Sequence, residues 1–277
     1  MDELTEALEL ATEEELKQIT QILFQPRFNP LDYWKTPEPL EIQSQDWQTW
    51  ITSVDNRFRY LAADGLTVLR GTTKELSYRQ ILIQVCLFLK IPYSQQMATT
   101  DIEAEIFLYL AEKTWDRLPK KEKRSLQGKI IRTLSQSNPP EPLPLQMQND
   151  PIKMLLKGSS IVAVNSILKS WLLKHFAQQF ALHFATYQAA KTALIKGGTA
   201  TAIGLQSKFA LQVAKKGMAV TAARYGAVRT VFSFMGPVMW GWFLADLGWK
   251  AISTNYTRIV PIIFTLAQIR LTRDLGF

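Results

Sequence analysis

The chain has 277 residues, a net charge of +8 and one cysteine, which provides material for a sizeable core but excludes an internal disulfide. The charge is unevenly distributed, because residues 1–150 contain 17 Lys and Arg against 22 Asp and Glu, whereas residues 151–277 contain 15 against 2. An acidic part joined to a strongly basic part predicts two regions with different roles.

The first residues suggest a protein of the cytoplasmic side, and the cysteine predicts a buried thiol. The start, Met1–Leu4, is acidic, and no basic segment followed by an apolar one, as in a signal peptide, comes after it. The single Cys86 lies within the apolar run Ile81–Leu89, which predicts a buried and unreactive thiol.

Residues 1–45 predict a helix followed by a proline-rich arm. Apolar residues recur every three to four positions over 2–24, and Thr12 and Glu15 have capping-box spacing, so two short helices could meet at Thr12. Over 25–43 a regular helix is excluded by four prolines: Pro26, Pro30, Pro37 and Pro39.

Residues 46–135 predict a helical bundle, which we interpret as acidic from the balance of residues 1–150. Four helices are expected: 46–63, 78–89, one opened by a capping box at Thr100–Glu103, and one starting at Pro119. The residues expected to face the core are Trp47, Trp50, Ile51, Val54, Phe58, Leu61, Ile81, Leu82, Val85, Phe88, Ile102, Ile106, Leu110, Trp115, Leu126, Ile130, Ile131 and Leu134.

The last of these helices starts with four cations, which are candidate partner-contact residues: Lys120, Lys121, Lys123 and Arg124. Positive charge is unfavourable there because the helix dipole is positive at its N-terminus. One interpretation is a solvated face partly offset by Glu122, and the other is contact with an acidic partner.

Residues 136–150 predict a semi-rigid linker, because four prolines exclude helix and regular sheet: Pro139, Pro140, Pro142 and Pro144. The predicted organisation is therefore an arm at 1–45, a bundle at 46–135, this linker, and a basic, apolar, Gly- and Ala-rich helical region at 151–277. The regular elements are all expected to be helices, so the predicted fold class is all-α.

The C-terminal region is the most distinctive part of the sequence. It contains no Asp or Glu before Asp246, while eleven Lys and Arg alternate with apolar runs up to that point. Its two longest uncharged runs have 16 residues, fewer than the ~20 that a spanning helix needs. Small residues four apart, such as Ala200 and Gly204, favour close helix packing. The runs could just span a bilayer, lie in its interface, or form a soluble core.

We expect this region to contact an anionic membrane. Gly236–Pro237 bends the richest run and places two tryptophans at headgroup depth. Ten residues are candidate membrane contacts: Lys215, Lys216, Arg224, Arg229, Phe232, Phe234, Met235, Trp240, Trp242 and Phe243.

No catalytic or metal-binding pattern is recognisable in the sequence. His175 and His183 lie eight residues apart on one predicted helix, too far for one metal without other ligands. Lys196–Thr199 resembles part of a phosphate loop but has neither the required order nor a preceding strand. The N-terminal carboxylates lie mostly at helix starts, where capping accounts for them. We therefore predict a non-enzymatic protein without cofactor, metal or small-molecule substrate.

Several short segments taken together are similar to one bacterial family: Leu8–Leu16, Phe28–Tyr33, Ser77–Cys86, Thr100–Glu103, Gly236–Gly241 and Tyr256–Pro261. On these segments the chain resembles the YaaW family over most of its length. The resemblance implies no biochemical activity. A likeness of the family's middle region to assembly chaperones for ubiquinol–cytochrome c reductase implies help in membrane-protein assembly. Asp246–Ala251 departs from the small, polar sequence usual in the family.

The leading hypothesis is an adaptor or assembly factor at the cytoplasmic face of a membrane, with the basic region on anionic lipid and the bundle on a membrane protein under assembly. One alternative is a membrane-remodelling or permeabilising protein with an inserting Gly- and Ala-rich hairpin. A nucleic-acid-binding protein is the third, less favoured because apolar residues separate the cations instead of leaving them clustered.

Overall fold

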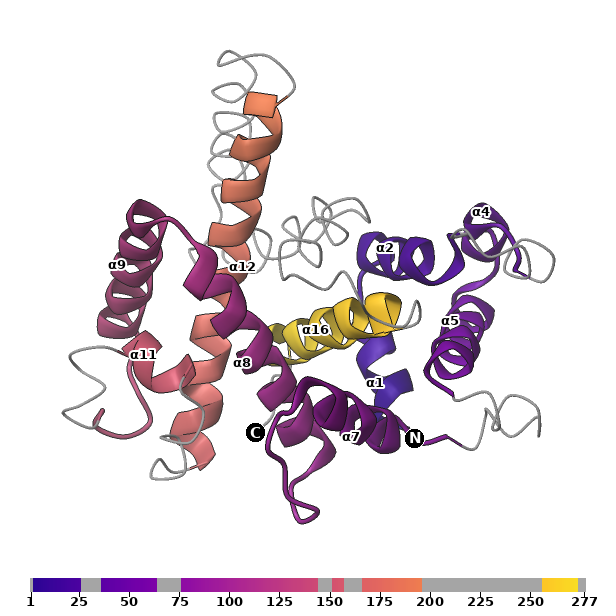
Figure 1. The fold of residues 1–277 in the computed structure, drawn as a ribbon, viewed down its shortest axis with the longest axis horizontal. Helices are drawn as coiled ribbons and strands as arrows, with labels where there is room; N and C mark the ends of the chain where they lie inside the picture. The colour runs from indigo at the N-terminus through magenta and orange to yellow at the C-terminus, as the bar shows by residue number, and fades with distance from the viewer. Residues whose placement is uncertain are drawn as a thin grey trace. The chain divides into compact units, whose positions relative to one another are not determined.

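The computed structural model describes residues 2–25, 36–63, 76–143, 151–156, 166–195 and 256–273, and every regular element in these ranges is an α-helix (Figure 1). This confirms the all-α class. The chain divides into two compact units. The first comprises residues 1–117, 156–158 and 240–276, and the second comprises 118–155, 159–239 and 277.

Seven described helices belong to the first unit: α1 (Glu3–Glu9), α2 (Glu13–Phe24), α4 (Pro39–Gln43), α5 (Trp47–Ala62), α7 (Tyr78–Leu89), α8 (Thr99–Arg117) and α16 (Tyr256–Arg273). The second unit contains α9 (Lys120–Gln136), α12 (Ser166–Ile195) and all but the last residue of α11 (Pro151–Leu156). The chain thus leaves the first unit before the expected linker at 136–150, and its last described helix returns to that unit.

Local capping fixes the early helices of the first unit. Thr12 accepts a hydrogen bond from the Glu15 backbone N–H at 3.3 Å, and the Glu15 carboxylate accepts one from the Thr12 N–H at 2.7 Å. This capping box starts α2 and separates it from α1, as the spacing predicts. Ser77 and Gln80 form a second box at the start of α7, and α7 ends at Lys90, which has a positive φ of 58°.

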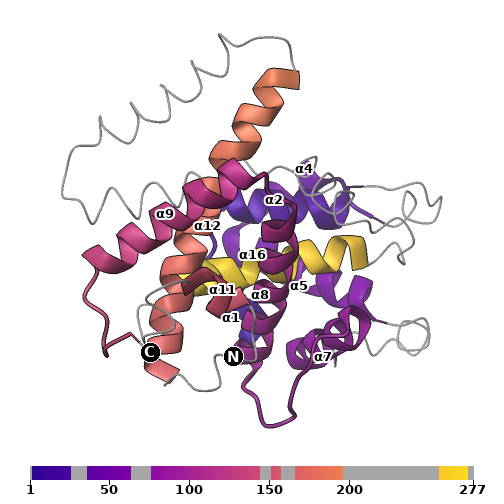
Figure 2. The same cartoon turned by 60° about the vertical axis from the view of Figure 1, so that its left-hand side comes forward.

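Helix α16 is the central element of the first unit. It packs against α1, α2, α5, α7 and α8 (Figures 1 and 2). Its residues 258–270 are all buried, and the Phe264 ring stacks on Phe107 of α8 with centroids 4.9 Å apart. A helix buried on all sides needs apolar residues around its whole circumference, which the run Ile259–Ile269 provides.

Three arginines of α16 bind groups at the ends of the N-terminal helices. Arg258, which is 1 % exposed, donates to the Leu23 and Gln25 carbonyl oxygens at the end of α2, at 3.4 and 3.1 Å. A cation is favourable there because helix C-termini carry unpaired carbonyls and negative dipole charge. Arg273 donates to the Leu10 carbonyl oxygen just past α1 and to the Glu15 carboxylate. The third, Arg270, is described with its partners below.

The structure corrects several expectations for the bundle. Three residues expected in the core are more than one third exposed: Trp47 by 36 %, Phe88 by 37 % and Ile131 by 40 %. Helix α8 starts at Thr99, so Glu103 does not close a capping box and lies buried among other helices. Residues 46–135 contain 14 Lys and Arg against 10 Asp and Glu, so the acidic excess belongs to residues 1–45 and not to the bundle.

In the second unit, α9 packs against α12 (Figure 2). The buried face of α9 consists of Leu126, Ile130 and Leu134, four residues apart, so that one stripe covers the partner helix. Pro119 is the N-cap of α9 and not its first residue. The helix continues to Gln136, after which residues 137–143 have no regular structure, as expected for the start of a linker.

A hydrogen bond between α2 and α5 gives a first testable prediction. The Trp50 indole N–H donates to the Thr20 hydroxyl at 2.7 Å, and both residues are buried. Thr20→Val keeps the shape but leaves this N–H without an acceptor, which should lower the free energy of unfolding by about 1–3 kcal/mol. Thr52→Val is the matched control. The Thr20 and Thr52 hydroxyls each donate to the carbonyl oxygen four residues back, but Thr52 lies on an exposed surface. If urea unfolding showed the same loss of unfolding free energy for Thr20→Val and Thr52→Val, the hydrogen bond from Trp50 would have no stabilising role.

Candidate functional site

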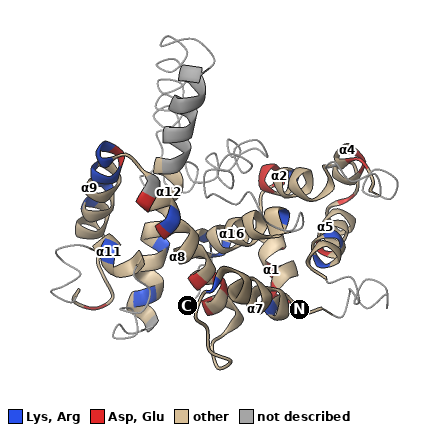
Figure 3. Cartoon of the chain, in the orientation of Figure 1, with Lys and Arg blue, Asp and Glu red and all other residues tan. Residues whose placement is uncertain are grey.

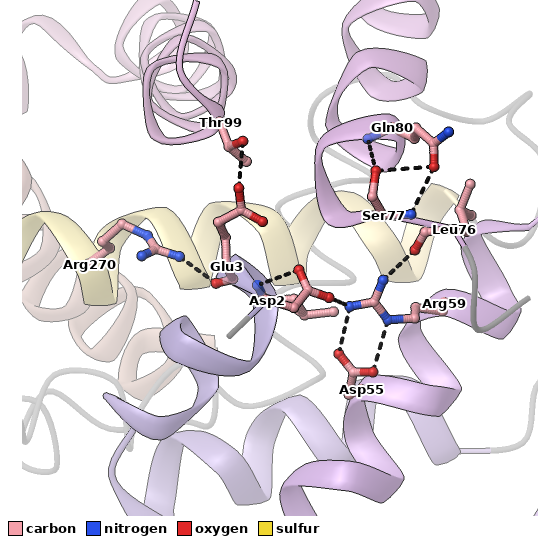
Figure 4. Close-up of polar contacts among 10 residues, drawn as sticks. Asp2, Glu3, Asp55, Arg59, Leu76, Ser77, Gln80, Thr99 and Arg270 are labelled. Carbon is pink, nitrogen blue, oxygen red and sulfur yellow. Dashed lines mark hydrogen bonds and ion pairs between the residues drawn. The ribbon is translucent and has the colours of Figure 1, made fainter.

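Besides the contacts of Arg258 and Arg273 described above, two clusters of buried charge lie in the first unit, and the first is centred on Arg59 of α5. Its guanidinium pairs with both carboxylate oxygens of Asp55, at 2.9 and 3.1 Å, and with Asp2 (Figure 4). It also donates to the Leu76 carbonyl oxygen just before α7. This arrangement joins three separate segments of the chain through one side chain, which is a structural role.

The second cluster is centred on Glu103 of α8 and Arg270 of α16. Arg270 donates to Glu103 at 3.3 Å and to the Glu3 backbone carbonyl at 2.6 Å. The Tyr78 hydroxyl, which is also buried, lies near the same carboxyl group. Burial raises the pKa of Glu103 to about 7, against the opposing effect of Arg270. The Glu3 carboxylate accepts a hydrogen bond from the Thr99 hydroxyl at 2.9 Å (Figure 4). The polar groups of this cluster therefore bind one another and link the helices that carry them.

The second unit has a different distribution of charge, because the cations of α9 face solvent. The helix contains six Lys and Arg and one acidic residue, Glu122. Five of the six cations are exposed: Lys120, Lys121, Arg124, Lys129 and Arg132. Figure 3 shows how they gather on α9, most densely at its start. Helical spacing places Ile131, which is 40 % exposed, on the same face as Lys120 and Arg124.

Glu122 does not offset this face, because it is directed toward α12. Its carboxylate lies 3.1 Å from Nε2 of His183, which is 2 % exposed. On the other side of the ring, Lys129 Nζ lies 3.4 Å from His183 Nδ1. An ammonium can only donate, so Nδ1 is the acceptor and the ring is neutral with its proton on Nε2. Burial and the Lys129 cation lower the pKa of His183, against the opposing effect of Glu122.

The predicted site residues are described only in part. Lys120, Lys121 and Arg124 share the exposed face of α9, whereas Lys123 is half-buried beside it. The ten candidate membrane contacts lie between Lys215 and Phe243, outside the residues that the structure describes.

The sequence analysis missed the contact of His183 with Glu122 and Lys129. The two α9 residues lie far from His183 in sequence, and only the packing of α9 on α12 brings them together. The nearest signal was Glu122 itself, the lone carboxylate among the cations of α9. His175 has a local partner, since its Nδ1 lies 2.8 Å from the Trp171 carbonyl oxygen.

Two further properties of the described residues bear on function. None of the described helices is both long and apolar enough to cross a bilayer, and within the same residues no three His, Cys, Asp or Glu side chains are grouped as metal ligands. Comparison with known proteins finds no matching family model, no matching curated protein and no matching solved structure. The resemblance to the YaaW family therefore stays a prediction.

Proposed function

We propose that this protein is a non-enzymatic helical adaptor that binds the anionic lipid of a membrane's cytoplasmic face and holds a membrane protein during its assembly. The observation that carries the lipid-binding part is the exposed face of α9. Lys120, Lys121, Arg124 and Arg132 make no ion pair with any described residue, and the one carboxylate of the helix is directed at His183.

The energetics of this face fit a lipid surface. Each Lys or Arg near an anionic bilayer contributes ~1 kcal/mol of binding free energy, so four or five cations on one face attach a protein reversibly. Ile131 lies among these cations and adds an apolar side chain that can enter the headgroup region. Cations mixed with an exposed apolar residue favour lipid, because the apolar side chain can enter the headgroup region while the cations bind the headgroups.

The C-terminal sequence supports the same proposal. Its basic and apolar character extends through residues 196–255, which contain the candidate membrane contacts around Trp240 and Trp242. The arginines of α16 do not contribute, because Arg258, Arg270 and Arg273 bind carbonyls and carboxylates of the first unit. Helices α1 to α8 of the first unit would then be the part that contacts the protein partner.

The test is the binding of the full-length protein to vesicles of phosphatidylcholine with and without phosphatidylglycerol. The variant Lys120→Gln/Arg124→Gln should bind the phosphatidylglycerol vesicles about thirtyfold less tightly at low salt, because two cations contribute ~2 kcal/mol. The control is Lys90→Gln/Lys113→Gln, which removes the same charge from exposed positions of the first unit and should bind like the unchanged protein. The difference should shrink as salt screens it.

Three outcomes decide against parts of the proposal. Equal losses in the two double variants would show that net charge acts without α9. An unchanged protein that ignores vesicles at low salt would remove the membrane. Binding to single-stranded or duplex DNA that depends on Lys120 and Arg124, without vesicle binding, would identify the face as a phosphate-backbone site.

A further inference from the structure

We infer that His183 is a proton-controlled regulator of the basic face of α9: at neutral pH it holds Lys129 and Glu122 in a cluster without net charge, and on acidification it makes the cluster positive and releases Lys129 toward anionic lipid. This inference rests on the proposed function of α9. It concerns the Glu122–His183–Lys129 cluster, which in the proposed function only directs the Glu122 carboxylate away from the exposed face.

The contacts of the ring determine what a proton does. In the neutral ring Nδ1 is the only acceptor, and the Lys129 ammonium, 3.4 Å away, occupies it. Protonation places the new N–H on that same nitrogen, so both ring nitrogens become donors. Before protonation, Lys129 Nζ is a donor that faces an acceptor, Nδ1. After protonation, Lys129 and His183 are two neighbouring cations that repel each other. Lys129 is exposed on α9, so its flexible side chain can turn to solvent.

The charge of the cluster changes at the same time. With a neutral ring, the negative Glu122 and the positive Lys129 balance each other. With a protonated ring, Glu122 pairs with His183, 3.1 Å away, and one positive charge remains. That charge is the Lys129 ammonium, and it lies on the helix that carries Lys121, Arg124 and Arg132. Acidification therefore adds an uncompensated cation to the face that is proposed to bind lipid.

The surroundings of the ring make this change dependent on its two neighbours. Among the described residues, the charged groups that act on His183 are Lys129, which opposes its protonation, and Glu122, which favours it; both come from α9. Burial adds to the effect of Lys129, so the ring stays neutral at neutral pH and takes up its proton below the ordinary histidine range. The unfolded chain accepts the proton more readily, so acidification also loosens α9 on α12.

The experiment measures binding of the full-length protein to phosphatidylglycerol vesicles at about pH 7.5 and about pH 5.5, a range in which the lipid phosphate stays ionised. The unchanged protein should bind about fivefold more tightly at the lower pH, the effect of one added cation near the surface. His183→Gln should abolish this gain, because the Gln side chain is neutral at both pH values and its carbonyl can still accept from Lys129. His175→Gln, the same change on the same helix, should keep the gain.

Two neighbouring substitutions provide a test that does not require His183→Gln to fold. Lys129→Gln removes the cation that opposes protonation, so the pH at which His183 takes up its proton, followed by NMR of its imidazole C–H groups, should rise. Glu122→Gln removes the carboxylate that favours protonation, so that pH should fall. Opposite shifts from two substitutions on one helix would not arise from titrating groups elsewhere, such as Glu103.

The outcomes separate this inference from the proposed function. If the unchanged protein binds vesicles equally at both pH values, or if folded His183→Gln keeps the gain, the regulation by His183 is wrong while the lipid-binding face stands. Shifts of the same sign in Lys129→Gln and Glu122→Gln would also overturn it. Absence of vesicle binding at both pH values would instead reject the proposed function.

Discussion

A chain that ends at residue 255, just before α16, should fail to fold its first unit. The missing helix has 14 buried residues and packs against α1, α2, α5, α7 and α8. Burying each large apolar side chain contributes about 1.5–3 kcal/mol, so the loss exceeds the 5–15 kcal/mol that typically separate folded from unfolded domains. Hydrogen exchange should show α1 to α8 unprotected, and circular dichroism should show a large loss of helix.

Two comparisons make this expectation specific. A chain ending at Arg273 keeps α16 and should unfold like the full protein. Phe264→Ala should lower the free energy of unfolding by about 3–5 kcal/mol, because its ring is buried against Phe107, whereas Phe88→Ala should cost less because Phe88 is partly exposed beside Tyr256. Protected amides in α5 and α7 without α16 would show that the N-terminal helices form a unit by themselves.

The second large effect should come from Arg270→Met, which removes the partner of a buried carboxylate. Glu103 is 1 % exposed and pairs with Arg270 at 3.3 Å. Breaking such a pair from one side costs about 3–5 kcal/mol, because the remaining charge has no compensation. The double variant Arg270→Met/Glu103→Leu should recover most of the loss, since an apolar pair of similar volume needs no counter-charge. A double variant as unstable as Arg270→Met would show that Arg270 acts mainly through the Glu3 carbonyl.

The pH dependence of this pair has a definite sign. Burial raises the pKa of Glu103 to about 7, above the ordinary 4.5, so the folded protein binds a proton more readily than the unfolded chain. The contribution of Glu103 to stability is therefore full below pH 4.5 and is lost as the pH rises through about 7. Arg270→Met removes the guanidinium that lowers this pKa, so its destabilisation should be greatest above pH 7. Chemical unfolding of Glu103→Gln should show a smaller pH dependence across this range, and the part that remains should include Asp55, because burial raises its pKa to about 6.

The sequence predicted those parts of the fold that depend on local chemistry. The capping box of Thr12 and Glu15 and the limits of α7 follow from side chains that bond their own backbone or from the spacing of apolar residues. Spacing alone misplaced Phe88, because a stripe identifies one face of a helix but not how much of that face another helix covers. Glu103 had capping-box spacing, yet its carboxylate pairs with a residue 167 positions away.

No local pattern in the sequence indicated that α16 would be the central, buried helix of the first unit. Arg258 and Arg270 flank an apolar run, a pattern that is typical of a membrane-interface helix as well as of a buried one. The buried position is decided by carbonyl oxygens at the end of α2, which have no acceptor role within that helix and bind Arg258. These carbonyls belong to residues more than 230 positions earlier. For the candidate site, Lys120, Lys121 and Arg124 were predicted from charge, while the contact of Glu122 with His183 required knowledge of how α9 packs.

The position of α16 also affects how the protein is made. A ribosome releases α1 to α8 first and must add about 140 further residues before Tyr256 appears, which at ~5–20 residues per second takes roughly 7–30 s. Throughout that interval the apolar surfaces that α16 will cover are open to solvent and to chaperones. The first unit is therefore expected to fold only after α16 has been synthesised, and a chain terminated before α16 should be recognised as unfolded and degraded. A finished first unit would thus report that residues 1–273, including the region that is proposed to reach the membrane, have been synthesised.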